Sequence, residues 1–273
     1  MLVPDAMNTG CIMKDLFNVE NKIVLVTGGS SGIGEMIAKG YVEAGSKVYI
    51  TSRKANMCSE VASKLNMHGP GQCFAIPADL QKPDHLKHLV AEISQREDHL
   101  DVLINCAGAV WNERFDDFPD EAFEKVINLN LRRVFQLIQL CFPLLTAKAS
   151  TSNPSSVINI GSVNGFGAVA TETYSYTAAK AGLHHLTRHM AGKLGHRGVT
   201  FNVVAPGAFQ SKIMAETLQK HGDKIIAANP MGRIGTAEDI AGTCIYLSSR
   251  AGQHTNGAVI AVDGGSSWYA SKW

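Results

Sequence analysis

Short apolar runs rich in β-branched residues alternate along the chain with longer segments whose apolar positions recur at helical spacing. The short runs are nearly continuous in their apolar character, which is typical of strands buried on both faces of a parallel sheet. The alternation therefore predicts an α/β fold, in which one doubly wound parallel sheet of about seven strands carries helices on both faces. The expected strands are 22–27, 47–52, 73–77, 101–105, 156–162, 199–206 and 258–263, and the expected helices start near Ile33 or cover 54–66, 83–97, 120–148, 173–196 and 236–249.

The limits of the domain follow from the same pattern. Residues 1–20 mix Pro4, Asn8 and Gly10 with short apolar patches that show no period, so we expect an N-terminal extension that is partly disordered. Residues 21–273 contain no internal repeat, low-complexity linker or shift of composition. We expect them to form a single domain.

The charges of the chain nearly cancel. It has 25 Lys and Arg against 24 Asp and Glu in 273 residues, without a basic block, so no nucleic-acid partner is expected. The longest apolar stretches are strand-length, far below the ~20 residues that span a bilayer, and the N-terminus lacks the pattern of a secretory leader. We therefore expect a cytoplasmic protein without a membrane partner.

Cysteine and histidine positions bear on metal binding. The six cysteines are scattered without CxxC pairs, which predicts free thiols rather than a zinc site or a disulfide framework. His185 and His189 have the spacing of ligands on one helical face, but no glutamate lies between them. No metal is expected.

A glycine-rich loop, "TGGSSGIG" at 27–34, follows the first strand and opens the first helix. Small residues let the backbone approach a pyrophosphate closely, and the helix N-terminus supplies free N–H groups. The spacing departs from the common Gly-x-Gly-x-x-Gly fingerprint, and glycine clusters also serve ordinary turns. The strand-to-helix context nevertheless predicts a dinucleotide site in a Rossmann-type fold, formed by Gly28, Ser30, Ser31, Gly32, Ile33 and Gly34.

The end of the second strand bears on which dinucleotide binds. An acidic residue there would bind the ribose 2′-hydroxyl of NAD, but the chain has Ser52, Arg53 and Lys54. Arg53 can meet the additional phosphate of NADP with a forked, charge-assisted contact. These three residues favour NADP(H) as the cofactor, although a solvated loop arginine is the alternative interpretation.

The stretch "YSYTAAK" at 174–180 holds two tyrosines and one lysine. Because positions four apart lie on one face of a helix, Lys180 should face Tyr176 and not Tyr174. An ammonium group close to a phenol stabilises the phenolate and lowers the pKa of the phenol, which would allow Tyr176 to exchange protons. A lone Tyr-x-x-x-Lys is also compatible with an ordinary amphipathic helix.

Several separate stretches together resemble the short-chain dehydrogenase/reductase family, from about Lys22 to Gly265. They are "TGGSSGIG", "ADL" at 78–80, "NCAG" at 105–108, "NLN" at 128–130, "INIGS" at 158–162, "YTAAK" at 176–180 and "APG" at 205–207, in the family's order and spacing. "NCAG" departs from the usual Asn-Asn-Ala-Gly by placing Cys106 second.

The resemblance implies roles for individual residues. Ser162 would stabilise a substrate oxygen, Tyr176 would exchange its proton and Lys180 would support that tyrosine, with Asn130 holding a water that links Lys180 to solvent. Tyr176 and Lys180 would also contact the cofactor, and family members are commonly homotetramers or homodimers. The remaining cofactor contacts that the resemblance implies are Asp79, Leu80, Asn105, Ala107, Gly108, Pro206 and Gly207.

The substrate is less well defined by the sequence. The stretches "INIGSVNG" and "NPMGRIG" look most like NADPH-dependent β-ketoacyl reductases associated with rhamnolipid synthesis, which implies reduction of a 3-oxoacyl thioester or another hydrophobic ketone. The alternatives are a dehydrogenase or reductase for a sugar, polyol, steroid or other small carbonyl compound, and a nucleotide-sensing protein without turnover. The resemblance also places a substrate lid between Ala208 and Met231, where the spacing predicts one apolar helix face of Phe209, Ile213, Met214 and Leu218.

Overall fold

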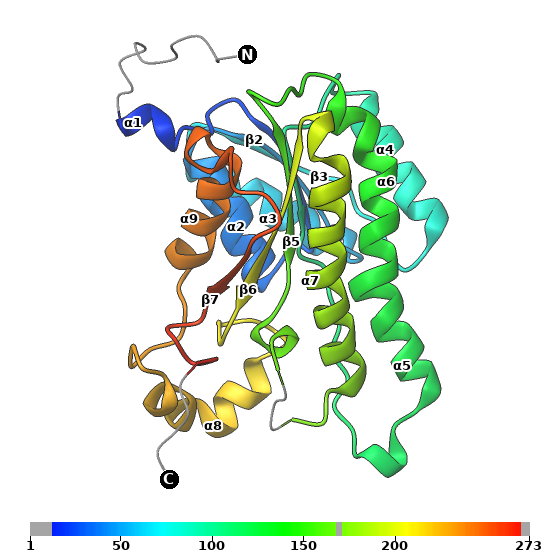
Figure 1. Ribbon diagram of the computed structural model, residues 1–273, viewed down its shortest axis with the longest axis vertical. Coiled ribbons are helices and arrows are strands. Elements are labelled where there is room, and N and C mark those ends of the chain that lie inside the picture. Colours follow the sequence, from blue (N-terminus) through cyan, green and yellow to red (C-terminus); the bar gives the residue numbers. More distant parts are fainter. Residues whose placement is uncertain (1–12, 168–170, 269–273) are drawn as a thin grey trace.

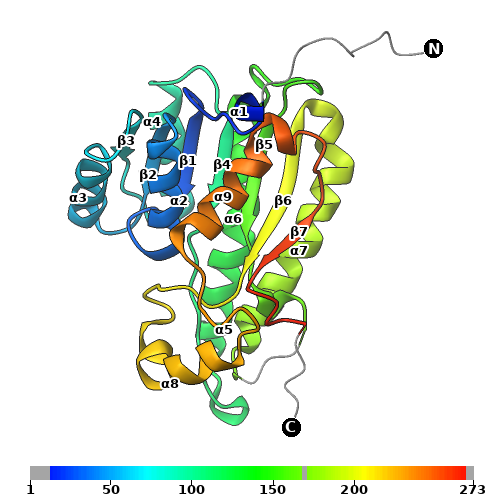
Figure 2. The same cartoon turned by 90° about the vertical axis from the view of Figure 1, so that its left-hand side faces the viewer.

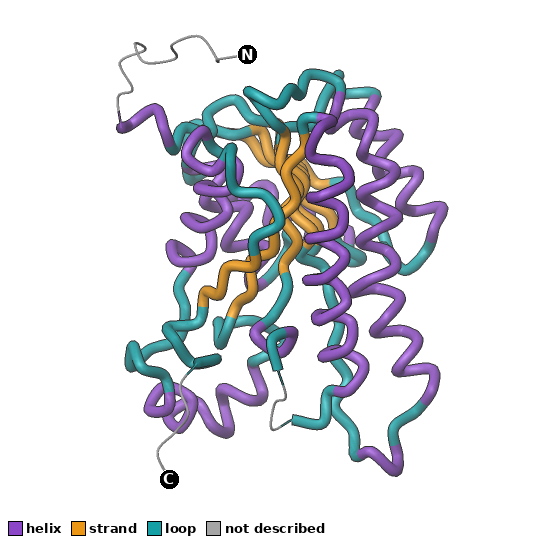
Figure 3. Tube along the Cα trace, viewed as in Figure 1, coloured by secondary structure: helices purple, strands orange, loops and turns teal. Residues whose placement is uncertain are grey.

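The computed structural model describes residues 13–167 and 171–268. Its centre is a seven-stranded, all-parallel sheet in the order β3-β2-β1-β4-β5-β6-β7 (Figures 1 and 3). This confirms the predicted doubly wound α/β fold. The strands are β1 (Ile23–Thr27), β2 (Lys47–Thr51), β3 (Gln72–Ala75), β4 (Val102–Asn105), β5 (Ser155–Ile160), β6 (Val199–Pro206) and β7 (Val259–Val262).

Helices cover both faces of the sheet (Figures 1 and 2). Successive residues of a strand point to opposite faces, so Val24 and Val26 of β1 pack into one apolar cluster while Leu25 packs into the other. The first cluster is closed by α2, α3 and α9, the second by α4, α6 and α7. The helices are α1 (Met13–Leu16), α2 (Gly32–Glu43), α3 (Ala55–Leu65), α4 (Pro83–Ser94), α5 (Asp120–Ile127), α6 (Arg133–Thr146), α7 (Tyr174–Leu194), α8 (Ala215–Ala228) and α9 (Ala237–Ser248).

The strand order reverses between β1 and β4, which are neighbours in the sheet although β2 and β3 separate them in sequence. At such a point the two adjoining loops diverge to opposite faces and leave a crevice beyond the carboxyl ends of the strands. The glycine-rich loop after β1 and the "NCAG" loop after β4 therefore meet at this position.

The helix predicted over 120–148 is interrupted. A π-helical turn at Asn128–Arg132 separates α5 from α6. The cause is Asn130, whose side-chain amide donates to the carbonyl of Val126 at 2.8 Å and so competes with the backbone for an acceptor one turn earlier. Periodicity could not reveal the interruption, because buried apolar positions continue on both sides of the turn, against α7 from α5 and in the core of the sheet from α6.

The N-terminal part of the chain is described only from residue 13. Residues 1–12, on which most of the predicted extension falls, lie outside the described residues. Val19 is buried and packs into the cluster that contains Val24 and Val26. No helix in the described part of the chain is both long enough and apolar enough to cross a membrane.

The insertion between β6 and α9 contains α8, which lies beyond the carboxyl end of the sheet in both views (Figures 1 and 2). The predicted single apolar helix face is wrong, because α8 begins only at Ala215 and Leu218 alone of the four residues lies on it. Phe209 is instead buried in the core and bridges to Gly235, while Ile213 is 47% exposed. We refer to residues 208–231 as the lid segment.

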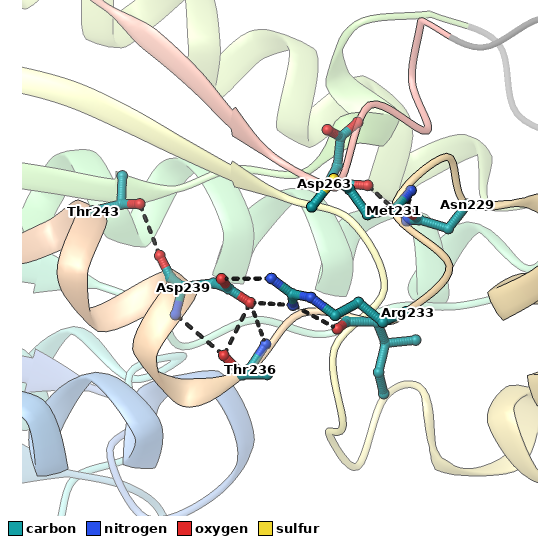
Figure 4. A network of polar contacts seen from close by, with 8 residues as sticks. Asn229, Met231, Arg233, Thr236, Asp239, Thr243 and Asp263 are labelled. Carbon is teal, nitrogen blue, oxygen red and sulfur yellow. Dashed lines mark hydrogen bonds and ion pairs between the residues drawn. The ribbon is translucent and has the colours of Figure 1, made fainter.

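Figure 4 shows two sets of polar contacts, one near the end of the lid segment, where Asn229 donates to the Asp263 carbonyl at 2.8 Å, and one at the start of α9. Arg233 donates two hydrogen bonds to the Asp239 carboxylate, at 2.6 and 3.0 Å. Asp239 also accepts from the backbone N–H of Thr236, while the Thr236 hydroxyl accepts from the backbone N–H of Asp239, which completes a capping box at the start of α9. These hydrogen bonds hold the pKa of Asp239 well below its usual range.

The capping box yields a stability prediction. Thr236→Ala removes the acceptor for the first turn of α9 and should lower the free energy of unfolding by about 1 kcal/mol. Thr236→Ser keeps the hydroxyl and should stay close to the parent protein. Chemical denaturation measures both, and an alanine variant as stable as the serine variant would show that the cap contributes nothing.

Candidate active site

The carboxyl edge of β5 and the first two turns of α7 bring three of the predicted residues together. Ser162 follows β5 with extended backbone (φ −169°) and caps the short 3-10 helix Val163–Gly165, its hydroxyl accepting from the Asn164 N–H at 3.2 Å. Tyr176 and Lys180 lie on α7, which packs along β6 and the segment after β5. The Ser162 hydroxyl interacts with the phenol of Tyr176 and lowers its pKa, because the interaction favours the phenolate.

The predicted orientation of the lysine is confirmed. The Lys180 ammonium lies 5.5 Å from the centre of the Tyr176 ring. Tyr174 points elsewhere: it is 40% exposed and donates to the carboxylate of Glu172 at 3.0 Å. The helix therefore separates the two tyrosines into one surface residue and one that faces the lysine.

The predicted lowering of the phenol pKa is not found in this structure. Burial raises the pKa of Tyr176, and the hydrogen bond with Ser162 only partly opposes that rise. Lys180, itself only 5% exposed, donates to the backbone carbonyl of Ile160 at 2.7 Å, and no hydrogen bond among the described residues joins it to the phenol. Burial lowers the pKa of Lys180 to about 8, because the ammonium loses favourable hydration inside the protein.

Asn130 contributes through the loop after β4. Its amide donates to the carbonyls of Ala109 and Val126, both at 2.8 Å, and its oxygen accepts from the Ala109 N–H at 3.3 Å. A Cβ added at Gly108 would lie 2.7 Å from that oxygen. The buried asparagine thus fixes the 108–109 backbone beside Lys180, whose ammonium is 4.0 Å from the same Cβ position.

The glycine-rich loop forms a cradle, and side chains at its glycine positions would fill the space. Gly28 has φ +69°, and a Cβ there would lie 3.0 Å from the Cα of Ala107. A Cβ at Gly34 would lie 2.4 Å from the Gly28 carbonyl oxygen. Ser31 occupies the N-cap of α2 without a side-chain cap, which leaves the first-turn N–H groups available to a ligand. Gly32 and Ile33 begin the helix, and Ser30 is buried within the loop.

The end of β2 carries a polar group that has no protein partner. The Ser52 hydroxyl oxygen is buried and forms no hydrogen bond within the described chain. Arg53 and Lys54 are exposed next to it, before α3. An open cavity of about 490 Å³ lies there, lined by Lys54, Ala55, Asn56, Met57 and Glu60.

Other predicted cofactor residues line the same edge or lie behind it. Asp79 accepts from the Gln81 N–H at 3.1 Å, and Leu80 is buried. Asn105 is 3% exposed and donates to Asn159 at 2.9 Å, and Asn159 donates to Thr187, so the Asn105 side chain is buried on the face of the sheet that α7 covers. Pro206 ends β6, and Gly207 donates its N–H to Val262, where a Cβ would lie 2.7 Å from Asp263.

Three residues of this region were not singled out by sequence reasoning. Thr27 accepts from the N–H groups of Cys106 and Ala107 at 2.9 and 3.0 Å and so ties the "NCAG" loop to β1. His184 is 2% exposed, and Cβ atoms added at Gly161 or Gly165 would collide with its ring. Lys212, in the lid segment, reaches α3. Of these three residues, only Thr27 had a signal in the sequence, because it is a small polar residue at the end of β1.

No candidate metal site is found among the described residues. Within them, no group of three or more His, Cys, Asp or Glu side chains is arranged to hold a metal ion. Five cysteines are free thiols, as predicted, and Cys11 lies outside the described residues. The residues present instead fit a dinucleotide, because the glycine cradle, the open N-terminus of α2 and the unpartnered Ser52 hydroxyl adjoin one crevice.

Comparisons with known proteins agree with this geometry. A family model described as enoyl-(acyl carrier protein) reductase matches residues 28–267. The rhamnolipids biosynthesis 3-oxoacyl-(acyl-carrier-protein) reductase of Pseudomonas aeruginosa is 41% identical, over 93% of this chain and 99% of that protein. The 2-dehydro-3-deoxy-D-gluconate 5-dehydrogenase of Bacillus subtilis is 33% identical, over 93% and 97%. The solved Pseudomonas aeruginosa RhlG/NADP active-site complex matches with a TM-score of 0.89 at 40% identity, covering 93% of this chain and 99% of that one.

The family model spans most of the chain, and relatives above 30% identity cover nearly all of it. The resemblance predicted from the motifs is confirmed. The chain belongs to the short-chain dehydrogenase/reductase family of oxidoreductases.

Proposed function

We propose that this protein is an NADP(H)-dependent reductase that converts a ketone to a secondary alcohol. The observation that carries the proposal is the placement of Tyr176 between Ser162 and Lys180, at the strand edge where the dinucleotide cradle opens. A partly buried phenol that lies close to an ammonium group and a hydroxyl group is suited to donating a proton to an oxygen.

In the mechanism we infer, NADPH supplies the hydride when it is bound. Ser162 donates a hydrogen bond to the substrate carbonyl oxygen and stabilises the negative charge that develops there. Tyr176 then gives its hydroxyl proton to that oxygen. Because burial raises the pKa of Tyr176, the phenol carries its proton at neutral pH and is ready to act as the acid.

Lys180 has a supporting role in this proposal. Its ammonium would stabilise the phenolate left after proton transfer, and because only one of its three N–H donors is used by the Ile160 carbonyl, another can contact the cofactor ribose. Asn130 fixes the backbone at 108–109 next to the ammonium, and the oxygen of Asn130 has a second lone pair for the water that we expect to return a proton from solvent.

We infer NADP(H) as the cofactor because the acid expected for NAD is absent at the end of β2. Arg53 and Lys54 place two cations beside the Ser52 hydroxyl, where the 2′-phosphate would bind. We keep the other cofactor contacts proposed from sequence except for the Asn105 side chain, which is buried and bonded to Asn159. The similar RhlG structure is an NADP complex, which supports this choice.

For the substrate, we propose a 3-oxoacyl thioester or a similarly hydrophobic ketone. Phe166, four residues after Ser162, packs its ring 5.8 Å from that of Trp268. Ile213 and Trp111 expose further apolar surface, 47% and 38% respectively. Apolar side chains suit an acyl chain, whereas a sugar or polyol requires paired donors and acceptors. The 41% identical relative is named a 3-oxoacyl reductase, and the 33% identical sugar-acid dehydrogenase keeps that alternative class in the test panel.

We also infer a homotetramer or homodimer in the cytoplasm. Phe123 on α5 and Phe135 on α6 are 40% and 39% exposed, which supports burial of these helices against a second copy of the chain. A panel of 3-oxoacyl thioesters, sugar acids, polyols and steroids, with NADPH consumption as the readout, separates the substrate classes. A nucleotide sensor would bind NADPH and consume none with any of them.

The tyrosine assignment is tested by a matched pair of substitutions. Tyr176→Phe should reduce kcat by at least about 100-fold because the proton donor is lost, while NADPH affinity stays within about twofold. Tyr174→Phe removes only a surface hydroxyl bonded to Glu172 and should leave kcat unchanged. Steady-state kinetics and nucleotide titration measure both variants, and a Tyr176→Phe enzyme that keeps its activity would exclude this mechanism.

The pH profile of ketone reduction tests Lys180. Since burial lowers the pKa of Lys180 to about 8, the ammonium is present below that pH and is lost above it. We expect kcat/KM to be flat below about pH 8 and to fall at higher pH, while the phenol of Tyr176 remains protonated. Rates measured from about pH 6 to about pH 10 with NADPH binding as the control show this; a rise through pH 8 would contradict it.

The cofactor assignment is tested by Arg53→Ala. Loss of charged hydrogen bonds of roughly 1.5 to 3 kcal/mol should raise the Kd for NADPH about 10- to 150-fold and leave the Kd for NADH nearly unchanged. Titration with both nucleotides gives the comparison. Equal effects on the two would remove Arg53 from the phosphate site.

A further inference from the structure

The start of the lid segment lies directly on the cofactor crevice. A Cβ added at Gly32, at the beginning of α2, would lie 3.0 Å from the Cβ of Ser211 and 4.0 Å from the backbone nitrogen of Lys212. The N–H of Met214 donates to both the carbonyl and the hydroxyl of Ser211, at 3.1 and 3.3 Å. This turn holds residues 211–214 against the glycine-rich loop, ahead of α8.

From this turn the Lys212 side chain extends to α3. Its ammonium lies 3.4 Å from the sulfur of Met57, a residue in the first turns of that helix and 155 positions away in sequence. A thioether is a weak acceptor for an ammonium group. The contact places the cation at the cavity lined by Lys54, Ala55, Asn56, Met57 and Glu60 without neutralising it.

Lys54 lines this cavity, Arg53 precedes it in the chain, and Lys212 reaches the cavity through its contact with Met57. Among the ion pairs formed by the described residues, none involves Arg53, Lys54 or Lys212, and the carboxylate of Glu60 at the rim pairs with none of them. Like charges gathered at one site repel one another, and an anion bound between them removes that repulsion. A phosphate group is the anion that accepts charge-assisted bonds from several cations at once.

We propose that Lys212 is a third ligand of the cofactor's 2′-phosphate, supplied by the lid segment and opposed to Arg53 and Lys54. The inference rests on the proposed use of NADP(H). It makes Lys212 a residue that determines specificity, because the pyrophosphate and both riboses are common to NAD and NADP while this phosphate is not. It also gives the phosphate a mechanical effect: bound between α3 and the lid segment, it fastens α8 over the substrate side of the crevice.

The binding of NADPH and the binding of substrate must then affect each other equally. If the 2′-phosphate favours the closed lid segment, then a substrate that binds under the lid strengthens NADPH binding by the same factor. NADH, which lacks the phosphate, should leave the lid segment more open. The substrate KM should therefore be lower with NADPH than with NADH, and this difference should depend on Lys212.

The experiment compares Lys212→Met with Lys220→Met. Methionine keeps the length of the stem and removes the charge, and Lys220 is a matched exposed lysine of the lid segment, on α8, that pairs with Glu216. Kd values for NADPH and NADH come from nucleotide fluorescence, and lid closure comes from limited proteolysis with either nucleotide. For Lys212→Met we expect NADPH binding about tenfold weaker, NADH binding within about twofold, and loss of the protection that NADPH gives the lid. Lys220→Met should match the parent, and Lys212→Arg should restore most of the NADPH affinity.

The outcomes separate this inference from the proposed function. Parent protein that fails to bind NADPH, or an Arg53→Ala variant with no selective loss, would overturn the proposed cofactor. If those two behave as proposed while Lys212→Met binds NADPH like the parent, only the lid ligand is wrong. Equal losses for NADPH and NADH would assign Lys212 to the shared pyrophosphate and overturn the 2′-phosphate assignment.

Discussion

The site depends on a lysine ammonium buried in the middle of the protein. Lys180 is almost entirely removed from solvent, and its hydrogen bond to the Ile160 carbonyl replaces part of the lost hydration. Burial still lowers its pKa to about 8, so Lys180 remains charged at neutral pH although its desolvation is unfavourable. Such a cation stabilises any negative charge that develops beside it more strongly than a surface lysine would, because little water screens the interaction. Tyr176, one helical turn away, is the group positioned to use it.

The architecture serves to hold that charge in place. Because the order of the parallel strands reverses between β1 and β4, the cofactor cradle and the 105–109 loop meet at one edge of the sheet. Asn130 then connects the π-helical turn to this loop through two hydrogen bonds with Ala109 and to α5 through a third with Val126. The irregular turn costs helical hydrogen bonding, and in return the asparagine amide lies inside the protein next to Lys180.

The opposite end of the crevice shows different electrostatics. Arg53, Lys54 and Lys212 are solvent-accessible cations from β2–α3 and from the lid segment, and none of them forms an ion pair within the described residues. Water screens their attraction for a phosphate, so each would contribute modestly and selectivity would need their combination. In the function we propose, the buried lysine serves the chemistry, while the exposed cations select the cofactor and connect it to the lid segment.

The sequence by itself determined the sheet, the two helical layers, the glycine cradle and the Tyr176–Lys180 face, because these depend on neighbours within a few residues and on regular periods of two and 3.6. It could not show that a π-helical turn at Asn130 interrupts a helix, that Phe209 belongs to the core, or that the Asn105 side chain bonds Asn159. It also could not show that Lys180 bonds Ile160 while burial raises the pKa of Tyr176, nor that Lys212 meets Met57 across 155 positions. Those features were decided by tertiary structure, because desolvation and long-range contacts exist only once distant segments have packed together.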